Sequence, residues 1–482
     1  MRATLVAIAG VGAIASLSWP FTVDDAFITA RYAGRVAEGL GYTFHDGPPT
    51  DGVTGPLWLL PLVAAEWAGF DAVVTAKLFG AGCTLAAVGL VVVRLRRRAL
   101  GRRAAWVATL LMGVSATIGV WSVAGLETGA ATLVFTMLGL QLLERRTPIT
   151  DPLGARPSPP WPRVVTGALL ASCVPALRPE LTMATVVLAG GFAALFPRRG
   201  FAVGLGLVAG LGAMVVFRLS MFGSALPLAA SAKPGEFVHG LGYVGAGALL
   251  TLGALVPLIA VAAFHGALRI RVAALAVAVH IAAVAAAGGD WMPGFRLLAP
   301  VLPLAGYLAA VGAARLSLRR RSLMVALGCV GVSILVSGLD LAANLPRMRE
   351  AGATQEQAGG QLRASLEGVT SVALVDIGYA SYRQPFRVLD LGGLTDPTIA
   401  RLPGGHLSKR LPTGLLETWD PEAIVLHSAT RPEVVDGELR SLRGYPVEMQ
   451  VARLDAVRRG YQVATVIRYA PNYHYVVLRR SE

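Results

Sequence analysis

Long apolar runs recur through roughly the first 340 residues, separated by short polar or basic stretches. A membrane-spanning helix needs roughly 20 predominantly apolar residues. We predict eleven spans, at residues 3–20, 72–93, 104–123, 129–143, 164–177, 181–196, 201–221, 241–264, 272–287, 297–314 and 322–339. No small-residue cleavage site follows the first run, so we expect a retained helix and not a signal peptide. The pattern is typical of a polytopic α-helical membrane protein with about 11 transmembrane helices.

The apolar segment 56–67 is ambiguous, and the basic loops decide its interpretation. If it spanned the membrane, the basic loops at 94–103, 145–163, 198–199, 269–271 and 315–321 would move to the outer side, against the positive-inside rule. If it is an amphipathic helix in the interface, with its tryptophans at headgroup level, all five loops are cytoplasmic. We choose the second interpretation. It gives a first outer loop, residues 21–71, with interfacial helices.

The composition changes after about residue 344. The tail, 345–482, has proline, glycine and charge at the levels of a soluble protein, with strand-like runs at 372–376, 423–427 and 473–478. We therefore predict a transmembrane domain over 1–344 and a small extracytoplasmic α/β domain over 345–482. The second domain is either a lid or acceptor platform for a site in the first, or a passive docking domain.

Composition and charge exclude several classes of protein. The chain is 54% hydrophobic and 15% charged, where a soluble protein of this length has about 25% charged residues. The net charge of +14 lies in the loops between spans, which argues against a nucleic-acid partner and for a lipid bilayer. Cys83, Cys173 and Cys329 form no metal or disulfide pattern. The glycines at 200–212 fit helix packing better than phosphate binding, and we expect His45 and His406 at the surface.

Two adjacent carboxylates, Asp24 and Asp25, follow the first apolar run, with Arg31 a few residues further on. Charges at a membrane helix end are costly unless they face water, a partner or a headgroup. One explanation is capping, in which either aspartate accepts from the first free N–H groups of a helix that runs through Tyr32. The alternative is that one of the two carries out chemistry.

Other polar residues at helix ends fall on the same outer face under this topology. They are Glu127, Arg178, Glu180, Lys233, Asp290, Trp291 and Arg296. Each alone is explained by capping, snorkelling or an ion pair. Together they predict the wall of one water-accessible cavity. One aspartate would act there as general base on an acceptor hydroxyl, while Arg31, Arg178, Lys233 and Arg296 hold a lipid phosphate leaving group.

An ordered set of short motifs resembles the GT-C membrane glycosyltransferases. They are DDAFITARY at 24–32, GVTGPLW at 52–58, GLET at 125–128, RPE at 178–180, GGDWMPGFR at 288–296 and DLGGLTD at 390–396. Within that superfamily the set is similar to the branch of the terminal β-(1→2) arabinofuranosyltransferases, which includes relatives described as flagellar motor control proteins. The resemblance extends over most of the chain.

The resemblance implies an inverting transferase of the cytoplasmic membrane with its active site on the extracytoplasmic side. It implies a polyprenyl-phosphate sugar donor, decaprenyl-phosphate arabinofuranose in the mycobacterial case, and a cell-wall arabinan acceptor. Carried over, Asp24 and Asp25 become base and supporting carboxylate, with Asp24 the preferred base. Some members bind a divalent cation at this first-loop acid; no further ligand is recognisable here, so the metal is left unknown.

A second hypothesis is a non-catalytic membrane protein, either a transporter or an envelope or flagellar assembly factor that uses the same cavity for binding. A transporter is expected to show internal repeats and charged or broken helices near the bilayer midplane. Instead, the sequence has no repeat, and its charges cluster at helix ends.

Overall fold

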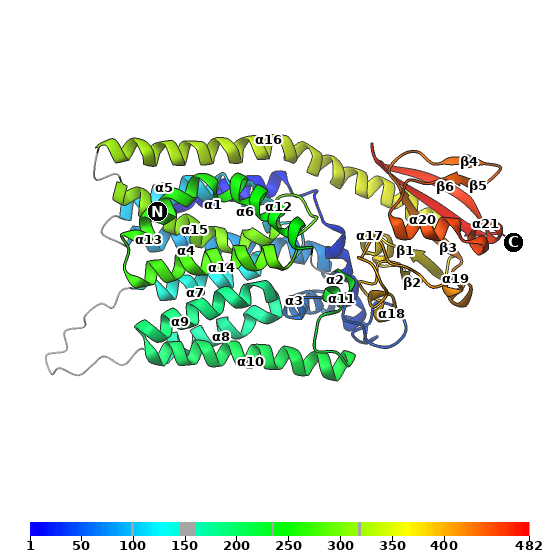
Figure 1. Ribbon diagram of the computed structural model, residues 1–482, viewed down its shortest axis with the longest axis horizontal. Coiled ribbons are helices and arrows are strands. Elements are labelled where there is room, and N and C mark those ends of the chain that lie inside the picture. The colour runs from blue at the N-terminus through cyan, green and yellow to red at the C-terminus, as the bar shows by residue number, and fades with distance from the viewer. Residues whose placement is uncertain (98–100, 145–160, 234–235, 317–319, 482) are drawn as a thin grey trace.

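The computed structural model describes residues 1–97, 101–144, 161–233, 236–316 and 320–481. A bundle of antiparallel helices fills one end of the molecule and a sheet-containing domain the other (Figure 1). The bundle helices are α1 (Arg2–Leu17), α4 (Ala72–Arg96), α5 (Gly101–Gly113), α6 (Ala116–Ser122), α7 (Thr128–Leu142), α8 (Trp161–Leu177), α9 (Thr182–Leu195), α10 (Pro197–Phe222), α12 (Phe237–Gly247), α13 (Val256–Phe264), α14 (Leu268–Ala286), α15 (Leu302–Leu316) and α16 (Arg320–Ser365).

Each of the eleven predicted spans coincides with a helix or a helix pair. Among the described residues, six helices are long and apolar enough to cross a membrane, and the pair α5–α6, bent by 62°, makes a seventh. The remaining four positions hold the shorter apolar helices α1, α7, α8 and α9. The chain is therefore a polytopic, multi-pass α-helical membrane protein, as predicted.

Small residues let the bundle helices approach closely. A Cβ atom on Gly206 or Gly210 of α10 would lie 2.1 or 2.2 Å from backbone carbonyl oxygens of α8. No side chain fits at that distance, so these positions require glycine. The prediction that the glycines at 200–212 serve helix packing is thus confirmed for Gly206 and Gly210, whereas a Cβ atom on Gly204 or Gly212 would meet nothing within 4 Å.

The basic loops meet at one end of the bundle. Arg94 lies 2.6 Å from the carboxylate of Glu144, and Arg163 and Arg199 lie 3.4 and 3.6 Å from it. These arginines come from three different loops, so the loops lie on one side, as the positive-inside rule predicts. We call this the basic end, and the end that faces the sheet the distal end.

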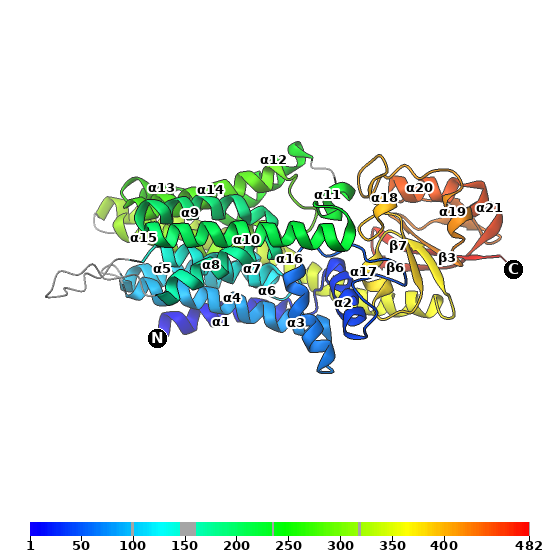
Figure 2. The same cartoon turned by 90° about the horizontal axis from the view of Figure 1, so that it is seen from below.

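The first outer loop forms two helices at the distal end, α2 (Asp24–Ala37) and α3 (Pro56–Trp67). Both lie between the bundle and the sheet in the two views (Figures 1 and 2). Trp67 at the end of α3 is 70% exposed, as a headgroup anchor should be. Trp58 is only 1% exposed and packs inside the protein, so the prediction that both tryptophans sit at headgroup level is wrong for Trp58.

Helix α16 connects the two parts of the molecule. It is one continuous helix of 46 residues that runs along the bundle and then against the sheet (Figure 1). The predicted division at residue 345 therefore falls inside a continuous helix. Past Pro346, the buried residue Leu362 of α16, and Leu366 just after the helix, join one core with Ile467 and Val477 of the sheet.

The C-terminal sheet has the strand order β2-β1-β3-β7-β6. Its strands are β1 (Ser371–Leu374), β2 (Arg387–Asp390), β3 (Ala423–Ser428), β6 (Tyr461–Ala470) and β7 (Tyr473–Arg480), and a separate ribbon pairs β4 (Glu433–Val435) with β5 (Glu438–Ser441). Strands β1, β2 and β3 are parallel, whereas β7 runs antiparallel to both β3 and β6.

Five short helices complete the domain, α17 (Ile377–Ser381), α18 (Pro397–Ala400), α19 (Leu415–Trp419), α20 (Pro446–Arg453) and α21 (Asp455–Gly460). Helices α20 and α21 pack on the sheet face opposite α16, where Val447, Val451 and Val457 join one core with Ile424 and Val476. The predicted soluble α/β domain is confirmed. Helix α17 follows β1 and packs on α2, so the carboxyl end of β1 points at the bundle. Ligands of open α/β sheets bind at this edge.

Candidate functional site

Asp24 joins the two parts of the molecule. Its two carboxylate oxygens accept hydrogen bonds of 2.8 Å from the backbone N–H groups of Gly378 and Tyr379, at the start of α17. The cap residue of its own helix is Val23, whose side chain makes no capping bond. The capping explanation is thus wrong for α2, but a related role holds, because Asp24 caps a helix that lies more than 350 residues away in sequence.

Asp25 differs from its neighbour. Within the described ranges it forms no hydrogen bond and no ion pair, and it is partly exposed. Because it follows Asp24 in the first turn of α2, it lies where the helix dipole favours negative charge. The structure thus gives one aspartate a fixed structural partner and leaves the other available.

Asp376, two residues after the end of β1, adds a third carboxylate. Burial raises the pKa of Asp24 to about 6, the bonds from Tyr379 and Gly378 lower it, and the charge of Asp25 raises it. Burial also holds the pKa of Asp376 well above its usual range, and the charges of Asp24 and Asp25 add to this. Like charges crowded at a partly buried site favour a bound proton on one of them.

The DLGGLTD motif forms a loop beside these carboxylates. Asp390, fully buried at the end of β2, accepts from the N–H groups of Gly392, Gly393 and Thr395 at 2.7 to 2.9 Å. Gly393 has φ of 74°, which glycine adopts without strain. The loop is therefore folded around one buried carboxylate.

His406 packs against this loop, with its Nδ1 3.1 Å from the Gly392 carbonyl oxygen. Burial lowers the pKa of His406 to about 4; the charge of Lys233 lowers it further, while that of Asp25 raises it. His406 thus lies near both Lys233 and Asp25. His406 is partly exposed, so our prediction of a surface residue holds only in part.

Lys233 follows the short helix α11 (Leu228–Ala232) at the distal end. In the part of the chain that the structure describes, its ammonium group has no carboxylate partner. Lys409, in contrast, is 1% exposed and donates to the carbonyl oxygens of Ala400 and Leu402 at 2.7 and 3.1 Å. We call Asp24, Asp25, Lys233, Asp376 and His406 the interface group.

The remaining predicted residues form a second set within the bundle. Arg178 lies between two carboxylates, with its Nε 2.9 Å from Glu127 and its Nη1 3.0 Å from Glu180. All three side chains are at most 15% exposed. The charges of both glutamates and of Asp290 act on Arg178. These residues and Arg296 form the bundle network.

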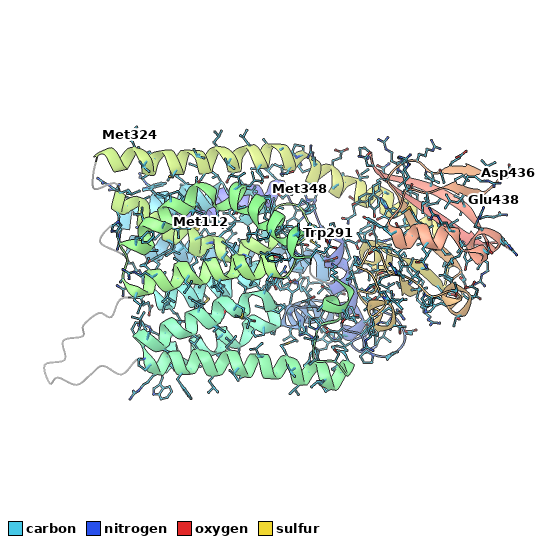
Figure 3. All side chains as sticks on the ribbon, viewed as in Figure 1. Met112, Trp291, Met324, Met348, Asp436 and Glu438 are labelled. Carbon is cyan, nitrogen blue, oxygen red and sulfur yellow. The ribbon has the colours of Figure 1, made fainter. Side chains whose placement is uncertain are left out.

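Asp290 and Arg296 are paired across a tight loop, with 2.6 Å between the carboxylate and Nε. The loop contains Gly288, Gly289 and Gly294 at positive φ, together with Phe295 at φ of 55°. A non-glycine residue in this region costs free energy, so packing must fix the turn. The intervening Trp291 is 63% exposed at the distal end (Figure 3).

The loop 124–127 links the two sets of charges. Its Gly125 has φ of 90°, and a Cβ atom there would lie 2.8 Å from the Cβ of Ala26, the residue after Asp25. The carbonyl of Ala124 accepts from the N–H of Val23 at 3.4 Å. Glu127 of the bundle network is thus held close to the start of α2.

Arg31 lies apart from both sets. It is 5% exposed, and its nitrogens donate to the carbonyl oxygens of Phe44, Ser381 and Phe386, the last at 3.0 Å. Two of these acceptors belong to the C-terminal domain. Because the guanidinium is directed at backbone carbonyls, the prediction of Arg31 as a phosphate ligand does not agree with the structure, and we assign it a structural role.

Sequence reasoning missed Asp376 and His406 as neighbours of the aspartate pair. The signal for Asp376 was its position at the end of a strand-like run, where ligand-binding residues of α/β sheets gather. No local pattern marked His406. Among the described residues no three His, Cys, Asp or Glu side chains gather as metal ligands, and both carboxylate oxygens of Asp24 accept backbone N–H groups.

Solved structures are similar to this protein over almost its whole length. ArnT from Cupriavidus metallidurans bound to undecaprenyl phosphate is similar with a TM-score of 0.59 and 14% identity, over 99% of this chain and 97% of that one. The archaeal oligosaccharyltransferase AglB from Archaeoglobus fulgidus, in complex with an inhibitory peptide and a dolichol-phosphate, is similar with a TM-score of 0.52 and 10% identity, over 88% and 69%. The chain has the GT-C fold.

Sequence comparisons add less. A family model described as a domain of unknown function (DUF8728) matches residues 346–478, most of the C-terminal domain. No curated protein matches the chain. At 10 to 14% identity the structural likeness shows the fold alone. A shared fold does not determine which reaction a protein catalyses.

Proposed function

We propose that this protein is an inverting glycosyltransferase that moves a sugar from a polyprenyl-phosphate donor to a cell-envelope glycan, on the outer face of the cytoplasmic membrane. Two observations support the donor class. The GT-C fold is shared with proteins bound to undecaprenyl phosphate and dolichol-phosphate, and the charged residues gather at one end of an apolar bundle. Arabinofuranose is the sugar that the motif set favours, with an arabinan as acceptor.

The observation that carries the proposal is the free carboxylate of Asp25. A general base needs a lone pair within reach of the acceptor hydroxyl. Both oxygens of Asp24 accept backbone N–H groups, so rotating its carboxylate toward a substrate would uncap α17. We therefore propose Asp25 as the base and Asp24 as the residue that positions the C-terminal domain beside it, the reverse of our preference from sequence.

In the proposed reaction, the acceptor hydroxyl oxygen attacks the anomeric carbon while Asp25 takes its proton. A new C–O bond forms as the bond between the anomeric carbon and the phosphate oxygen breaks, and the lipid phosphate leaves with the electron pair. This single displacement inverts the anomeric carbon and needs no covalent enzyme intermediate. Asp25 holds the proton and the leaving phosphate holds the electron pair, so the step is balanced.

Lys233 is the cation that we place at the leaving phosphate, because it has no described carboxylate partner and because its charge, like that of Asp25, acts on His406. A lysine acts there as a point charge. Arg296 is the second candidate, since only its Nε is used by Asp290 and a guanidinium has five N–H donors. Arg178 is held by two carboxylates, and we propose that it shapes the donor site without binding phosphate directly.

The test uses the full chain in lipid nanodiscs with synthetic polyprenyl-phosphate sugars and an arabinan acceptor. We expect transfer from the arabinofuranose donor, an inverted anomeric configuration by NMR, and loss of about 10²-fold or more of the rate in Asp25→Asn. Normal transfer by Asp25→Asn would exclude Asp25 as base. If no polyprenyl-phosphate sugar supports transfer by the wild-type protein, the function itself is wrong.

A further inference from the structure

Aromatic side chains gather at one end of the C-terminal sheet, and the proposed reaction does not use them. They are Tyr469 of β6, Tyr473 and Tyr475 of β7, His427 of β3 and Tyr445 before α20. The rings of Tyr473 and Tyr475 lie 5.3 Å apart, and Tyr469 lies 5.3 and 5.7 Å from them. The His427 ring lies 4.1 Å from Tyr473 and 4.6 Å from Tyr445. We call these five residues the aromatic patch.

The side chains of the aromatic patch are neither fully buried nor fully exposed. Tyr469, Tyr473 and Tyr475 are each partly exposed, at the end of the sheet face that α16 covers further along. Aromatic side chains that serve only packing are normally covered on both faces. Partly exposed rings grouped at one point offer apolar faces together with polar hydroxyl groups, a combination that suits ligand binding.

The aromatic patch is continuous with the interface group. The side chain of Tyr475 is hydrogen-bonded to Asp376. Burial raises the pKa of Tyr469 and Tyr475, and the charges of Asp24 and Asp376 raise it further. Tyr379, whose N–H group binds Asp24, also influences Tyr469. A molecule bound on the patch would therefore extend toward the carboxylates from the side of the soluble domain.

His427 provides an independent sign of a missing partner. It is 7% exposed, and its Nδ1 is buried with no hydrogen-bond partner within the described ranges. Its nearest carboxylate oxygen, on Glu448, is 3.6 Å away, beyond hydrogen-bond range. That carboxylate is already engaged by the N–H groups of His427 and Tyr445. A buried ring nitrogen without a partner is unfavourable, so a ligand hydroxyl could satisfy it.

We propose that the aromatic patch is the acceptor subsite, which binds a sugar ring of the glycan whose hydroxyl reacts at Asp25. This inference rests on the proposed function. A sugar presents C–H bonds on its ring faces, which fit against the negative face of an aromatic ring. Its hydroxyl groups can meet His427 Nδ1 and the tyrosine hydroxyls. The patch lies in the soluble domain, whereas the polyprenyl chain of the donor must stay with the bundle.

The experiment measures binding and kinetics separately on the full-length protein in nanodiscs. The probes are a linear arabinan oligosaccharide and a linear mannan oligosaccharide, studied by equilibrium dialysis. We expect Tyr473→Leu to weaken binding of the oligosaccharide that the wild-type protein binds by about tenfold or more. The KM for the acceptor should rise by the same factor, and the KM for the donor should stay unchanged. Tyr473→Phe keeps the ring and should stay within about twofold of wild type. Asn472→Ala, in the exposed turn between β6 and β7, is the matched control.

His427→Phe provides a second test that does not depend on the folding of Tyr473→Leu. It keeps an aromatic ring and removes the ring nitrogens, so we expect weaker oligosaccharide binding at an unchanged melting temperature. Unchanged binding in both Tyr473→Leu and His427→Phe would overturn the proposal. It would also be overturned if the wild-type protein bound neither of the two oligosaccharides. Oligosaccharide binding that depends on Tyr473 and His427, without sugar transfer, would contradict the proposed function and leave the aromatic patch as a glycan-binding site with no part in transfer.

Discussion

The bundle network and the interface group both gather charge at the distal end of the molecule, but their charges are partnered differently. In the bundle network, Arg178 is in contact with Glu127 and Glu180, and Arg296 with Asp290. In the interface group, Asp24 is bound by backbone N–H groups, while Asp25 and Lys233 have no ion partner among the described residues. The second arrangement leaves groups available for a substrate.

This difference separates two uses of charge that look alike in a sequence. A buried ion pair is costly to form and more costly to break, so its members are committed to each other. An acid or a cation without an ion partner is available to bind a ligand. The comparison assigns scaffolding to the bundle network and chemistry to the interface group, and four perturbations test that assignment.

The largest effect on stability is expected from Arg178→Met. Loss of the guanidinium leaves Glu127 and Glu180 buried without a cation, which costs about 3–5 kcal/mol. Thermal unfolding of the detergent-solubilised protein measures this. Arg102→Met, at an exposed arginine of α5, is the matched control and should change little.

A triple variant tests whether the unpaired charges cause the expected loss of stability. Arg178→Met with Glu127→Gln and Glu180→Gln removes the unpaired charges, so we expect it to recover much of the lost stability. If Arg178→Met alone unfolds at the wild-type temperature, the bundle network is not a scaffold and the comparison is wrong.

Asp24→Asn is expected to have a smaller effect, about 1–2 kcal/mol, because an amide keeps one acceptor oxygen and turns an N–H group toward the other donor. Hydrogen exchange at the amides of Gly378 and Tyr379 should become faster, since both bind the Asp24 carboxylate. Unchanged protection there would show that the cap contributes nothing to the contact between bundle and sheet.

The pH dependence of stability follows from the raised pKa of Asp24, about 6 in the folded protein, against about 3.9 in the unfolded chain. The folded state holds the proton more tightly, so this contribution is largest below pH 4 and is lost as pH rises through 6. Between pH 5 and 7.5 the expected loss is about 1 kcal/mol. Melting curves across this range should show it, with a flatter profile in Asp24→Asn; a melting temperature that rises with pH would contradict it.

Lys233→Met is expected to change stability least, by about 0.5 kcal/mol or less, because the lysine has no described ion partner. Its effect should appear in the donor KM, raised about tenfold by loss of a charge-assisted contact to phosphate. Arg401→Met, at an exposed cation beside α18, is the control. A donor KM that stays at the wild-type value would remove Lys233 from the phosphate site.

The sequence predicts the helices well, because each membrane helix must bury its own backbone hydrogen bonds within one apolar run. It also predicts which polar residues lie at the distal end, because topology alternates from span to span. It does not predict their partners. Glu180 is two residues from Arg178 in the sequence, but only the packing of the bundle brings Glu127 to the same guanidinium, and nothing in the sequence shows that Lys233 has no such partner.

Long-range contacts explain the other corrections. Asp24 caps α17, and Arg31 binds the carbonyl groups of Ser381 and Phe386, contacts that no local pattern encodes. His406 approaches Asp25 only because Asp390 folds the DLGGLTD loop beneath it. These three cases all involve the C-terminal domain, whose placement on the bundle the sequence does not reveal.

The central claim is that two adjacent aspartates have separate roles, Asp25 in chemistry and Asp24 in holding the domains together. The most direct measurement compares the rate of sugar transfer per folded molecule in Asp24→Asn and Asp25→Asn, with melting temperatures from the same preparations. The account predicts a loss of about 10²-fold or more in Asp25→Asn at an unchanged melting temperature, and a lower melting temperature with most activity kept in Asp24→Asn. The reverse pattern, with Asp24→Asn inactive and stable, would contradict it.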